Sequence, residues 1–420
     1  MVTQITRALR TAATAGALIA LGLAGTAGAA SASTAPRAER AHPITVYVAD
    51  GGGNMVTPIS TVTNKAGTPI TVGKRPGQIV VTPNGKTAYV IAGGSVVPIR
   101  TATNTALKPI KGTSGASYIA ITPDGMTAYV AHCCFSQSSD EITPIDIATN
   151  TALKPITWKP GPAWGASIAI TPDGKTVYIA STAGYVTPIS TATNKAGKAI
   201  ALPSEAENGS AYIAITPDGK TAYVAESGPY QPGNTITPIS TVTSKAGKPI
   251  KVGQWPDAIA ITPDGKTVYV ASTGSGPTGC VVPANCGPAL AVPYASSGPA
   301  TVTPISTATN KPGKAIKIGP TGSITIAITP GGRTAYVLYG GYVIPIRTAT
   351  NTAFRPIKAG SGLNSIAVTP NGRTAYVTCD RNTSQGHELR GFVIPINTVT
   401  NRAGAPIKVG HDPGAIAITP

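Results

Sequence analysis

The chain repeats one pattern of apolar and polar residues eight times. Short runs rich in Val, Ile, Thr and Tyr alternate with clusters of Gly, Pro, Asn and Asp, as is typical of strands separated by turns. In one unit, the expected strands are 259–262, 267–271, 302–306 and 315–319. Four strands in a period of roughly 40 residues are the signature of a β-propeller blade. The pattern therefore predicts an all-β fold.

The repeat begins and ends within a unit, in complementary places. Residues 45–73 supply the last three strands of one unit, and residues 415–420 supply a first strand. The two pieces complete one blade if the chain closes into a ring, which leaves no open sheet edge inside it. The sequence thus predicts a single eight-bladed propeller of four-stranded antiparallel blades, closed by three N-terminal strands and one C-terminal strand. A ring of seven blades with a spare unit is the alternative.

Proline occurs in every expected third strand, from Pro58 to Pro395. Because proline cannot donate a ladder hydrogen bond, it is normally confined to edges and bulges of a sheet. We therefore expect a bulge at these prolines. Proline also begins most fourth strands, for example Pro249 and Pro406, where it hinders edge-to-edge pairing.

Residues 1–32 have the pattern of a signal peptide. Arg7 and Arg10 precede an apolar run of Ala, Leu and Gly, and small residues suited to cleavage follow. We expect residues 33–43 to be a short linker and residues 44–420 to form the propeller as one domain, with its longest insertion at 272–301. The mature chain is then secreted or associated with the cell wall and has no transmembrane segment. A membrane anchor at residues 1–32 is the alternative.

Charge is expected to divide between the two rims of the ring. The chain has 33 Lys and Arg residues and 16 Asp and Glu residues, a formal net charge of +17. We call turn rim the rim that holds the turns between first and second and between third and fourth strands, and loop rim the opposite one. The turn rim collects the cations Lys65, Lys86, Lys175, Lys195, Lys220, Lys245, Lys266, Lys311, Arg333, Arg373 and Arg402. The loop rim collects the acids Asp50, Asp140, Glu141, Glu205, Glu207, Glu226, Asp257, Asp380, Glu388 and Asp412.

A basic rim fits an anionic polymer of the cell wall, because summed charge raises the local concentration of such a partner. The same charge would also serve solubility alone. No aromatic residues interleave with these cations, so the sequence predicts no specific nucleic-acid partner. We expect the propeller to be a monomer.

Specific chemistry is expected on the loop rim, because the copies of the repeat disagree mainly there. The residues that end the second strands should surround the mouth of the central channel. Carboxylates, imidazoles and aromatic rings around a concave mouth fit a protein partner or a small polar ligand. The catalytic candidates are His132, Glu226, Asp50 and His411. The ligand-binding candidates are Trp255, Asp257, Tyr339, Asp380, Asp412, Tyr118 and Tyr212.

Several of these residues also fit a purely structural role. His132 fits a solvated loop residue, the pair His411 and Asp412 fits a turn, and a loop tryptophan such as Trp255 commonly packs over a blade seam. The chain has no CxxCH, HExxH, Walker, GxSxG or EF-hand motif. The sequence therefore predicts no cofactor and no metal, and it favours binding over catalysis.

Five cysteines are an odd number for an exported chain. Cys280 and Cys286 lie in the longest insertion, and we expect a disulfide between them. Cys379 is expected too many blades away to reach Cys133 or Cys134. A bond between Cys133 and Cys134, free thiols, and copper or zinc binding are the open alternatives for the remaining thiols.

The runs ITPDGKTAYVA (215–225) and VTPISTATNKAG (186–197) resemble the YVTN-type β-propeller repeat of secreted and surface-layer proteins. The likeness covers residues 44–420. The Asn of the family's Tyr-Val-x-Asn is replaced here, for example by Asp50, His132 and Glu226. The resemblance implies a propeller among families that include surface proteins, lactonase-like enzymes and lyases of cyclic peptides, and no motif of this chain matches the active sites of those enzymes.

Two functions are compatible with these observations. The first is a secreted or cell-surface binding or scaffold module that holds a ligand or protein on the acidic loop rim and contacts the anionic cell envelope with the basic turn rim. The alternative is a small-molecule hydrolase, lyase or oxidoreductase with its site at the channel mouth. Candidate side chains that converge within hydrogen-bond reach would favour an enzyme, whereas scattered ones would favour a binding surface.

Overall fold

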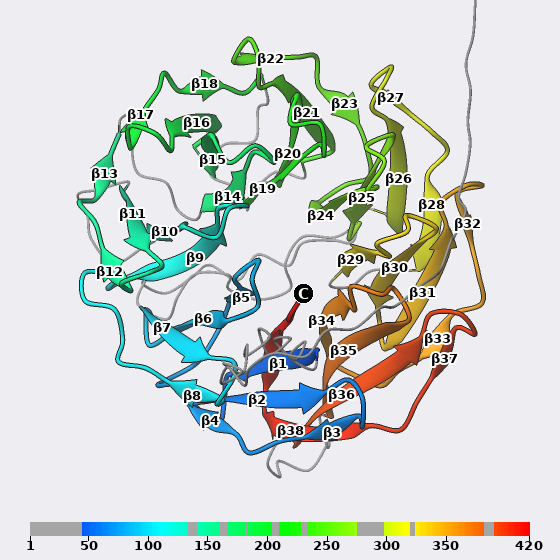
Figure 1. The fold of residues 1–420 in the computed structure, drawn as a ribbon. Helices are drawn as coiled ribbons and strands as arrows, with labels where there is room; N and C mark the ends of the chain where they lie inside the picture. The colour runs from blue at the N-terminus through cyan, green and yellow to red at the C-terminus, as the bar shows by residue number, and fades with distance from the viewer. Residues whose placement is uncertain are drawn as a thin grey trace, which may run out of the picture. The chain divides into compact units, whose positions relative to one another are not determined.

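The computed structural model describes residues 44–132, 141–158, 166–181, 183–203, 210–227, 233–274, 298–319, 324–381 and 390–420. The expected signal peptide (1–32) and linker (33–43) lie outside the described residues. Within the unit His42–Pro420, eight antiparallel sheets surround one axis as the blades of a propeller (Figure 1). The eight-bladed prediction is confirmed, and the seven-bladed alternative is wrong. Across the described residues, no helix is long and apolar enough to cross a membrane.

Each blade has an inner, a second, a third and an outer strand, and blades 1 to 8 follow the order of their second strands along the chain. From blade 1 onward, the inner strands are β39 (Pro413–Ile418), β5 (Ile79–Val81), β9 (Ala116–Ile121), β14 (Ala166–Ile170), β19 (Ser210–Ile215), β24 (Pro256–Ile261), β29 (Ile324–Ile328) and β34 (Leu363–Val368). The second strands are β1 (Thr45–Asp50), β6 (Thr87–Ala92), β10 (Thr127–His132), β15 (Thr176–Ser181), β20 (Thr221–Ser227), β25 (Thr267–Ser272), β30 (Thr334–Tyr339) and β35 (Thr374–Arg381).

The third strands are β2 (Met55–Ser60), β7 (Ser95–Arg100), β11 (Glu141–Asp146), β16 (Tyr185–Ser190), β21 (Thr235–Ser240), β26 (Ala300–Ser306), β31 (Tyr342–Arg347) and β36 (Arg390–Asn397). The outer strand begins with the short pieces β3 (Lys65–Ala66), β8 (Thr105–Ala106), β12 (Thr151–Ala152), β17 (Lys195–Ala196), β22 (Lys245–Ala246), β27 (Lys311–Pro312), β32 (Thr352–Ala353) and β37 (Arg402–Ala403). In seven blades it continues as β4 (Ile70–Thr71), β13 (Ile156–Thr157), β18 (Ile200–Ala201), β23 (Ile250–Lys251), β28 (Ile316–Gly319), β33 (Ile357–Lys358) or β38 (Ile407–His411).

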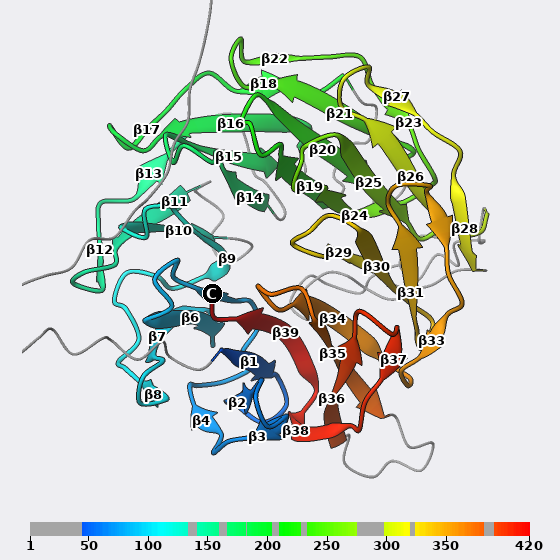
Figure 2. The ribbon, with the colours of Figure 1, turned by 45° about the vertical axis from the view of Figure 1, so that its right-hand side comes forward.

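Blade 1 is completed by the two ends of the ring. The C-terminal strand β39 pairs with β1 in a register that sets Val46 opposite Ile418 and Val48 opposite Ile416. The backbone N–H of Thr45 donates to Oγ1 of Thr419 at 2.8 Å. Figure 2 shows β39 beside β1 and next to the axis. The predicted closure by three strands and one strand is thus present.

The third-strand prolines do not form the expected bulges. The pairing of β1 with β2 passes through Pro58, opposite Tyr47, without a shift of register. Instead the outer strand is interrupted, because β3 ends at Ala66 and β4 begins only at Ile70. The N–H of Gly67 donates to the Pro58 carbonyl at 2.7 Å. Proline therefore presents its missing donor to the outer edge, where the interruption leaves no ladder partner unsatisfied.

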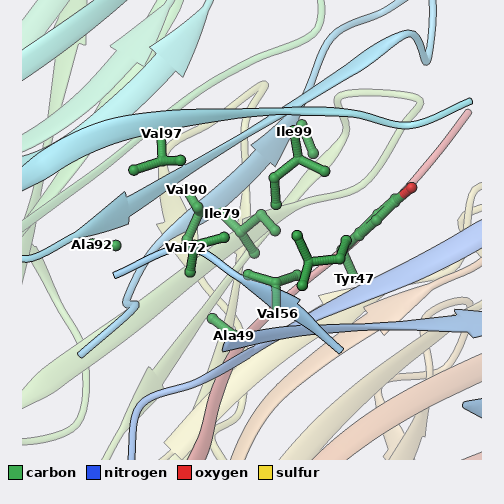
Figure 3. Close-up of a cluster of buried hydrophobic side chains, with 11 residues drawn as sticks. Tyr47, Ala49, Val56, Val72, Ile79, Val90, Ala92, Val97 and Ile99 are labelled. Atoms are coloured by element: carbon green, nitrogen blue, oxygen red, sulfur yellow. The ribbon is translucent and has the colours of Figure 1, made fainter. Parts of the chain in front are cut away.

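The hydrophobic core is divided among the seams between neighbouring blades. Between blades 1 and 2, Tyr47, Ala49 and Val56 pack against Ile79 and Val90 (Figure 3). Alternate side chains of each strand point to opposite faces, so every blade contributes to two seams. The repeated apolar pattern is therefore explained by packing between blades.

A ring of hydrogen bonds ties the seams together near the turn rim. The buried Tyr47 hydroxyl donates to Oδ1 of Asn104 in the next blade at 2.6 Å. The same bond is made by six further pairs, namely Tyr89–Asn150, Tyr129–Asn194, Tyr223–Asn310, Tyr269–Asn351, Tyr336–Asn401 and Tyr376–Asn64. In blade 5 the Asn is replaced by Ser244, and Tyr178 reaches only the Thr241 carbonyl at 3.5 Å. These Asn residues have positive φ, a conformation that Asn tolerates better than most residues.

The turns between inner and second strands are closed by their own side chains. The Thr122 hydroxyl and the N–H of Met126 both donate to Oδ1 of Asp124. The hydrogen bond from Thr122 is the main reason that the pKa of Asp124 is lowered. Asp173, Asp218 and Asp264 make the equivalent contacts. These aspartates are therefore turn residues.

Candidate functional site

The residues that end the second strands are mostly buried within the blades. Their side chains are at most 7% exposed at six positions, namely Asp50, Ala92, Ser181, Ser272, Tyr339 and Cys379. The expectation that these residues surround an open mouth is therefore wrong for all six. The physical reason is that the second strand lies between the inner and third strands, so that both neighbours and the adjacent blade cover its end.

Asp50 is a fully buried carboxyl group at the seam between blades 8 and 1. The Thr57 hydroxyl donates to its Oδ2 at 2.5 Å, and Oδ1 has no hydrogen-bond partner among the described residues. Burial raises the pKa of Asp50 to about 6, against the opposing effects of Thr57, the Gly410 backbone and the neighbouring His411. The structure thus brings together two of the four catalytic candidates, Asp50 and His411, but encloses the carboxylate.

His132 is held by hydrogen bonds at both ring nitrogens. Nδ1 lies 2.9 Å from the Ser114 carbonyl, and Nε2 lies 2.8 Å from Oγ1 of Thr143. The carbonyl can only accept, so Nδ1 carries a proton, and in the neutral ring Nε2 accepts from the Thr143 hydroxyl. His132 belongs to blade 3, whereas Asp50 and His411 belong to blades 1 and 8. His132 therefore anchors a loop of its own blade, apart from the other two candidates.

Asp380 and Asp412 form a carboxyl pair at the inner end of blade 8. Asn364 links this pair to blade 1, since its Nδ2 donates to Oδ2 of Asp380 and to the Pro413 carbonyl, both at 3.0 Å. Burial raises the pKa of Asp380, and the charge and hydrogen bond of Asp412 act in the same direction against the Asn364 bond. Asn364 was absent from the sequence candidates. It lies where the register of β34 with β35 shifts, which the apolar pattern does not reveal.

Tyr118 and Tyr212 lie at the inner edge of blades 3 and 5, on β9 and β19. Their side chains are 39% and 36% exposed, although protein surrounds much of each ring. Burial raises the pKa of both hydroxyl groups, and the charges of Asp257 and Tyr118 add to the rise at Tyr212. Tyr212 therefore lies within electrostatic reach of two other ligand-binding candidates, Tyr118 and Asp257. We call these three residues the inner-edge site.

Trp255 and Tyr339 are largely enclosed. Trp255 is 4% exposed and has a φ of 57°, a conformation that is unusual for a bulky residue. Its backbone N–H donates to the Gly233 carbonyl at 2.8 Å. Tyr339 covers Gly319, where any side chain would collide with the Tyr339 ring. Tyr339 thus packs in the seam between blades 6 and 7, and the burial of Trp255 fits its structural alternative.

Other candidates lie partly or wholly outside the described residues. The backbone of Glu226 belongs to β20, and its side chain lies outside the part of the chain that the structure describes. Cys280 and Cys286, with the disulfide expected between them, lie outside the described residues. Cys379 is buried in the seam between blades 7 and 8, among Ile394 and Ile396. Within the described part of the chain, no three His, Cys, Asp or Glu side chains lie together in a group that could hold a metal ion.

A group of buried oxygen atoms in blade 6 was also missed. Oε1 of Gln254, Oγ of Ser272 and Oγ1 of Thr301 and Thr303 have no hydrogen-bond partner among the described residues. A side chain at Gly253 would collide with both Ser272 and Thr301. Ordered water usually satisfies such atoms. A sequence signal for this group was available, because Thr301 and Thr303 stand two residues apart and so share one face of the strand.

The turn rim presents exposed positive charge. All eleven of its expected Lys and Arg residues are exposed. Acids also lie on this rim, and most of them close the turns: Asp124, Asp146, Asp173, Asp218 and Asp264. A groove of about 310 Å³ is lined by Thr221, Pro238, Ser240, Lys245, Ala246, Gly247 and Asn310. This rim repeats its residues from blade to blade, unlike the inner edge.

The fold is shared with several solved structures, whereas no family model and no curated protein sequence matches the chain. Kuenenia stuttgartiensis hydrazine synthase is 20% identical at a TM-score of 0.54, over 80% of this chain and 96% of that chain. The dihydro-heme d1 dehydrogenase NirN, in complex with DHE, is 12% identical at 0.65, over 89% and 74%. A functionally unknown protein from Desulfotomaculum acetoxidans is 17% identical at 0.57, over 89% and 98%. At these identities the likeness concerns the fold alone, so the chain is placed in the class of β-propeller proteins.

Proposed function

We propose that the chain is a secreted or cell-surface binding module whose ligand enters from the loop rim and rests on the inner-edge site. The observation that carries the proposal is the pair Tyr118 and Tyr212, which are both more than a third exposed beside Asp257. Aromatic side chains that protein surrounds, but that remain partly accessible to solvent, are typical of ligand sites. The catalytic candidates support the same choice, because His132 is held at both nitrogens and Asp50 is enclosed.

A ligand-observed NMR screen with four probe classes tests this function: a quaternary ammonium ion, a carboxylate, a neutral alcohol and a hexose. At least one class is expected to bind the wild-type chain and to lose its signal in the double variant Tyr118→Ala, Tyr212→Ala. Tyr342→Ala is the matched control, because Tyr342 is 43% exposed on the same rim but belongs to blade 7. If no class depends on Tyr118 and Tyr212, the proposed site is wrong.

The turn rim is proposed to hold the module against an anionic polymer of the cell envelope. The support is its repeated exposed cations, which raise the local concentration of polyanions at low salt. Retention of the protein on isolated cell wall should fall as salt rises, and the variant Lys220→Glu, Lys245→Glu should elute at lower salt. The control Lys251→Glu, Lys317→Glu makes the same charge change on outer strands near the loop rim. If both variants elute at the same lowered salt concentration, retention depends on the net charge of the protein and not on the turn rim.

An enzyme at the loop rim is the second proposal, and the carboxyl pair of Asp380 and Asp412 is the observation that favours it. A carboxyl group with a raised pKa beside a second carboxyl group is an arrangement that general acids use. Under this proposal Asp380→Asn abolishes hydrolysis of a lactone or peptide substrate, while circular dichroism shows that the variant is still folded. Turnover that survives in Asp380→Asn would exclude the pair.

A further inference from the structure

The two inner-edge tyrosines occupy equivalent places in blades 3 and 5. Each stands four residues before the buried threonine of its blade, and each lies opposite an alanine of the second strand, Ala131 or Ala225. The other blades have no aromatic residue at this position, where they carry Gln78, Ser167, Ala258, Thr325, Ser365 and Ala415. Blades 3 and 5 thus carry an aromatic side chain at this position, and the other six blades carry smaller side chains.

Blade 4 separates the two rings with a small residue. Its inner strand β14 lies between β9 and β19 around the axis (Figure 1). At the equivalent position β14 carries Ser167, whose Oγ accepts a hydrogen bond from the Ile213 N–H at 3.4 Å. Ser167 is therefore turned to the backbone of blade 5. The space between Tyr118 and Tyr212 is not filled by a large side chain from the strand that separates them.

The neighbouring inner strand, β24 of blade 6, carries a carboxylate at a bulge and packs against β19, the strand of Tyr212. Pro256 pairs with Ser272 and Ala258 with Ala271, so Asp257 is the extra residue of the ladder between β24 and β25. Bulges re-aim side chains and are common beside binding sites. Asp257 thus adds a negative charge to a site that already has two aromatic rings.

Rings and carboxylate together define the chemistry of the occupant. The faces of aromatic rings attract cations, and the attraction grows when the cation is desolvated. An anion would be repelled by Asp257, whereas a cation would be attracted both by this charge and by the faces of the rings. Resting on the proposed binding function, we propose that the inner-edge site binds an organic cation, an alkylammonium or quaternary ammonium group held by Tyr118 and Tyr212 with Asp257 as its counter-charge.

Calorimetry with choline tests this inference at neutral pH and low salt. The comparison probe is its neutral analogue, in which a tert-butyl group replaces the trimethylammonium group. Choline is expected to bind about tenfold more tightly than the analogue. Asp257→Asn should weaken choline about fivefold or more and leave the analogue unchanged, whereas Tyr212→Ala should weaken both. Glu141→Gln, the same charge change on the loop rim of blade 3, should leave choline binding unaltered.

The outcomes separate this inference from the proposed function. Equal binding of choline and its analogue, or unchanged choline binding in Asp257→Asn, overturns the cation assignment. If a hexose or a carboxylate is the one probe class whose binding depends on Tyr118 and Tyr212, the cation assignment is also overturned, while the binding function stands. Absence of any tyrosine-dependent probe overturns both. Melting temperatures equal to the wild type confirm that each variant is folded.

Discussion

The turn rim and the inner edge near the loop rim use the same repeat in opposite ways. On the turn rim, seven Tyr–Asn bonds and four Thr–Asp turns recur with nearly the same geometry from blade to blade. At the inner edge, equivalent positions hold residues as different as Tyr118, Ser167 and Ala258. Repetition therefore marks residues that hold the ring together, and variation marks residues available to a ligand. Changes on the turn rim should lower stability, and changes at the inner-edge site should lower affinity.

Deletion of β39 should have the largest effect of all. It would open the edge of β1 and remove Ile416 and Ile418 from the seam that contains Val46 and Val48. The loss should exceed about 5 kcal/mol, which is comparable to the whole stability of many domains. Circular dichroism should then show no cooperative melting. A chain that lacks only Pro420 is the control, and an unchanged transition after the deletion would mean that closure is dispensable.

Asp50 breaks the simple comparison, because it is a variable residue that should nevertheless affect stability. Its folded pKa is about 6 and the ordinary Asp value is 3.8, so folding favours the protonated form. Its contribution is complete below the unfolded pKa and is lost as pH rises through about 6. By linkage the loss is up to about 3 kcal/mol. Asp50→Asn should remove most of this dependence of stability on pH. Urea unfolding measured at a series of pH values around 6 tests it.

Two other groups of carboxylates provide the controls for that profile. The pKa of Asp380 is raised as well, so a slope of the same sign should persist in Asp50→Asn and disappear when Asp380→Asn is added. The turn aspartates, such as Asp124, have lowered pKa values and lose their contribution only at more acidic pH. A stability that does not fall between about pH 4 and pH 7 would contradict the enclosed position of Asp50.

The Tyr–Asn ring predicts a moderate loss at any one seam. In Asn401→Ala the Tyr336 hydroxyl loses its shorter hydrogen bond and keeps only the Thr398 carbonyl at 3.3 Å, and alanine takes a positive φ that it adopts poorly. We expect a loss of about 1–3 kcal/mol in the free energy of unfolding. Tyr336→Phe and the double variant complete a thermodynamic cycle, in which a coupling near zero would show that the bond adds nothing. Choline binding should not change.

Ser244, which replaces the Asn of the Tyr–Asn ring in blade 5, is the site of the smallest expected effect. This effect is a gain in stability. Ser244 has a φ of 52°, like the Asn of the other blades, but Tyr178 has no Asn amide to bond. Ser244→Asn should restore the eighth bond and raise stability by about 0.5–1.5 kcal/mol, measured by thermal melting. Ser244→Ala is the control and should not stabilise. A destabilised Ser244→Asn variant would show that this seam differs in more than one side chain.

The sequence by itself determined the blades, their number and the closure of the ring, because turn chemistry and strand periodicity are local properties that the repeat restates in every unit. It also located Tyr118, Tyr212 and Asp257 as candidates. It could not determine that Asp50 is enclosed, that His132 is held at both nitrogens, or that Asn364 bridges two blades. The sequence also did not predict that the outer strand is interrupted and that Pro58 forms no bulge.

These features were decided only by the tertiary structure, for one physical reason. Whether a side chain is covered depends on the neighbouring blade as well as on the neighbouring strand, and the neighbouring blade lies about 40 residues or more away in the chain. Asp50 is enclosed by residues of blade 8, at the far end of the sequence, such as Gly410 and His411. The ring that the repeat builds therefore determines which of its irregular residues a ligand can reach.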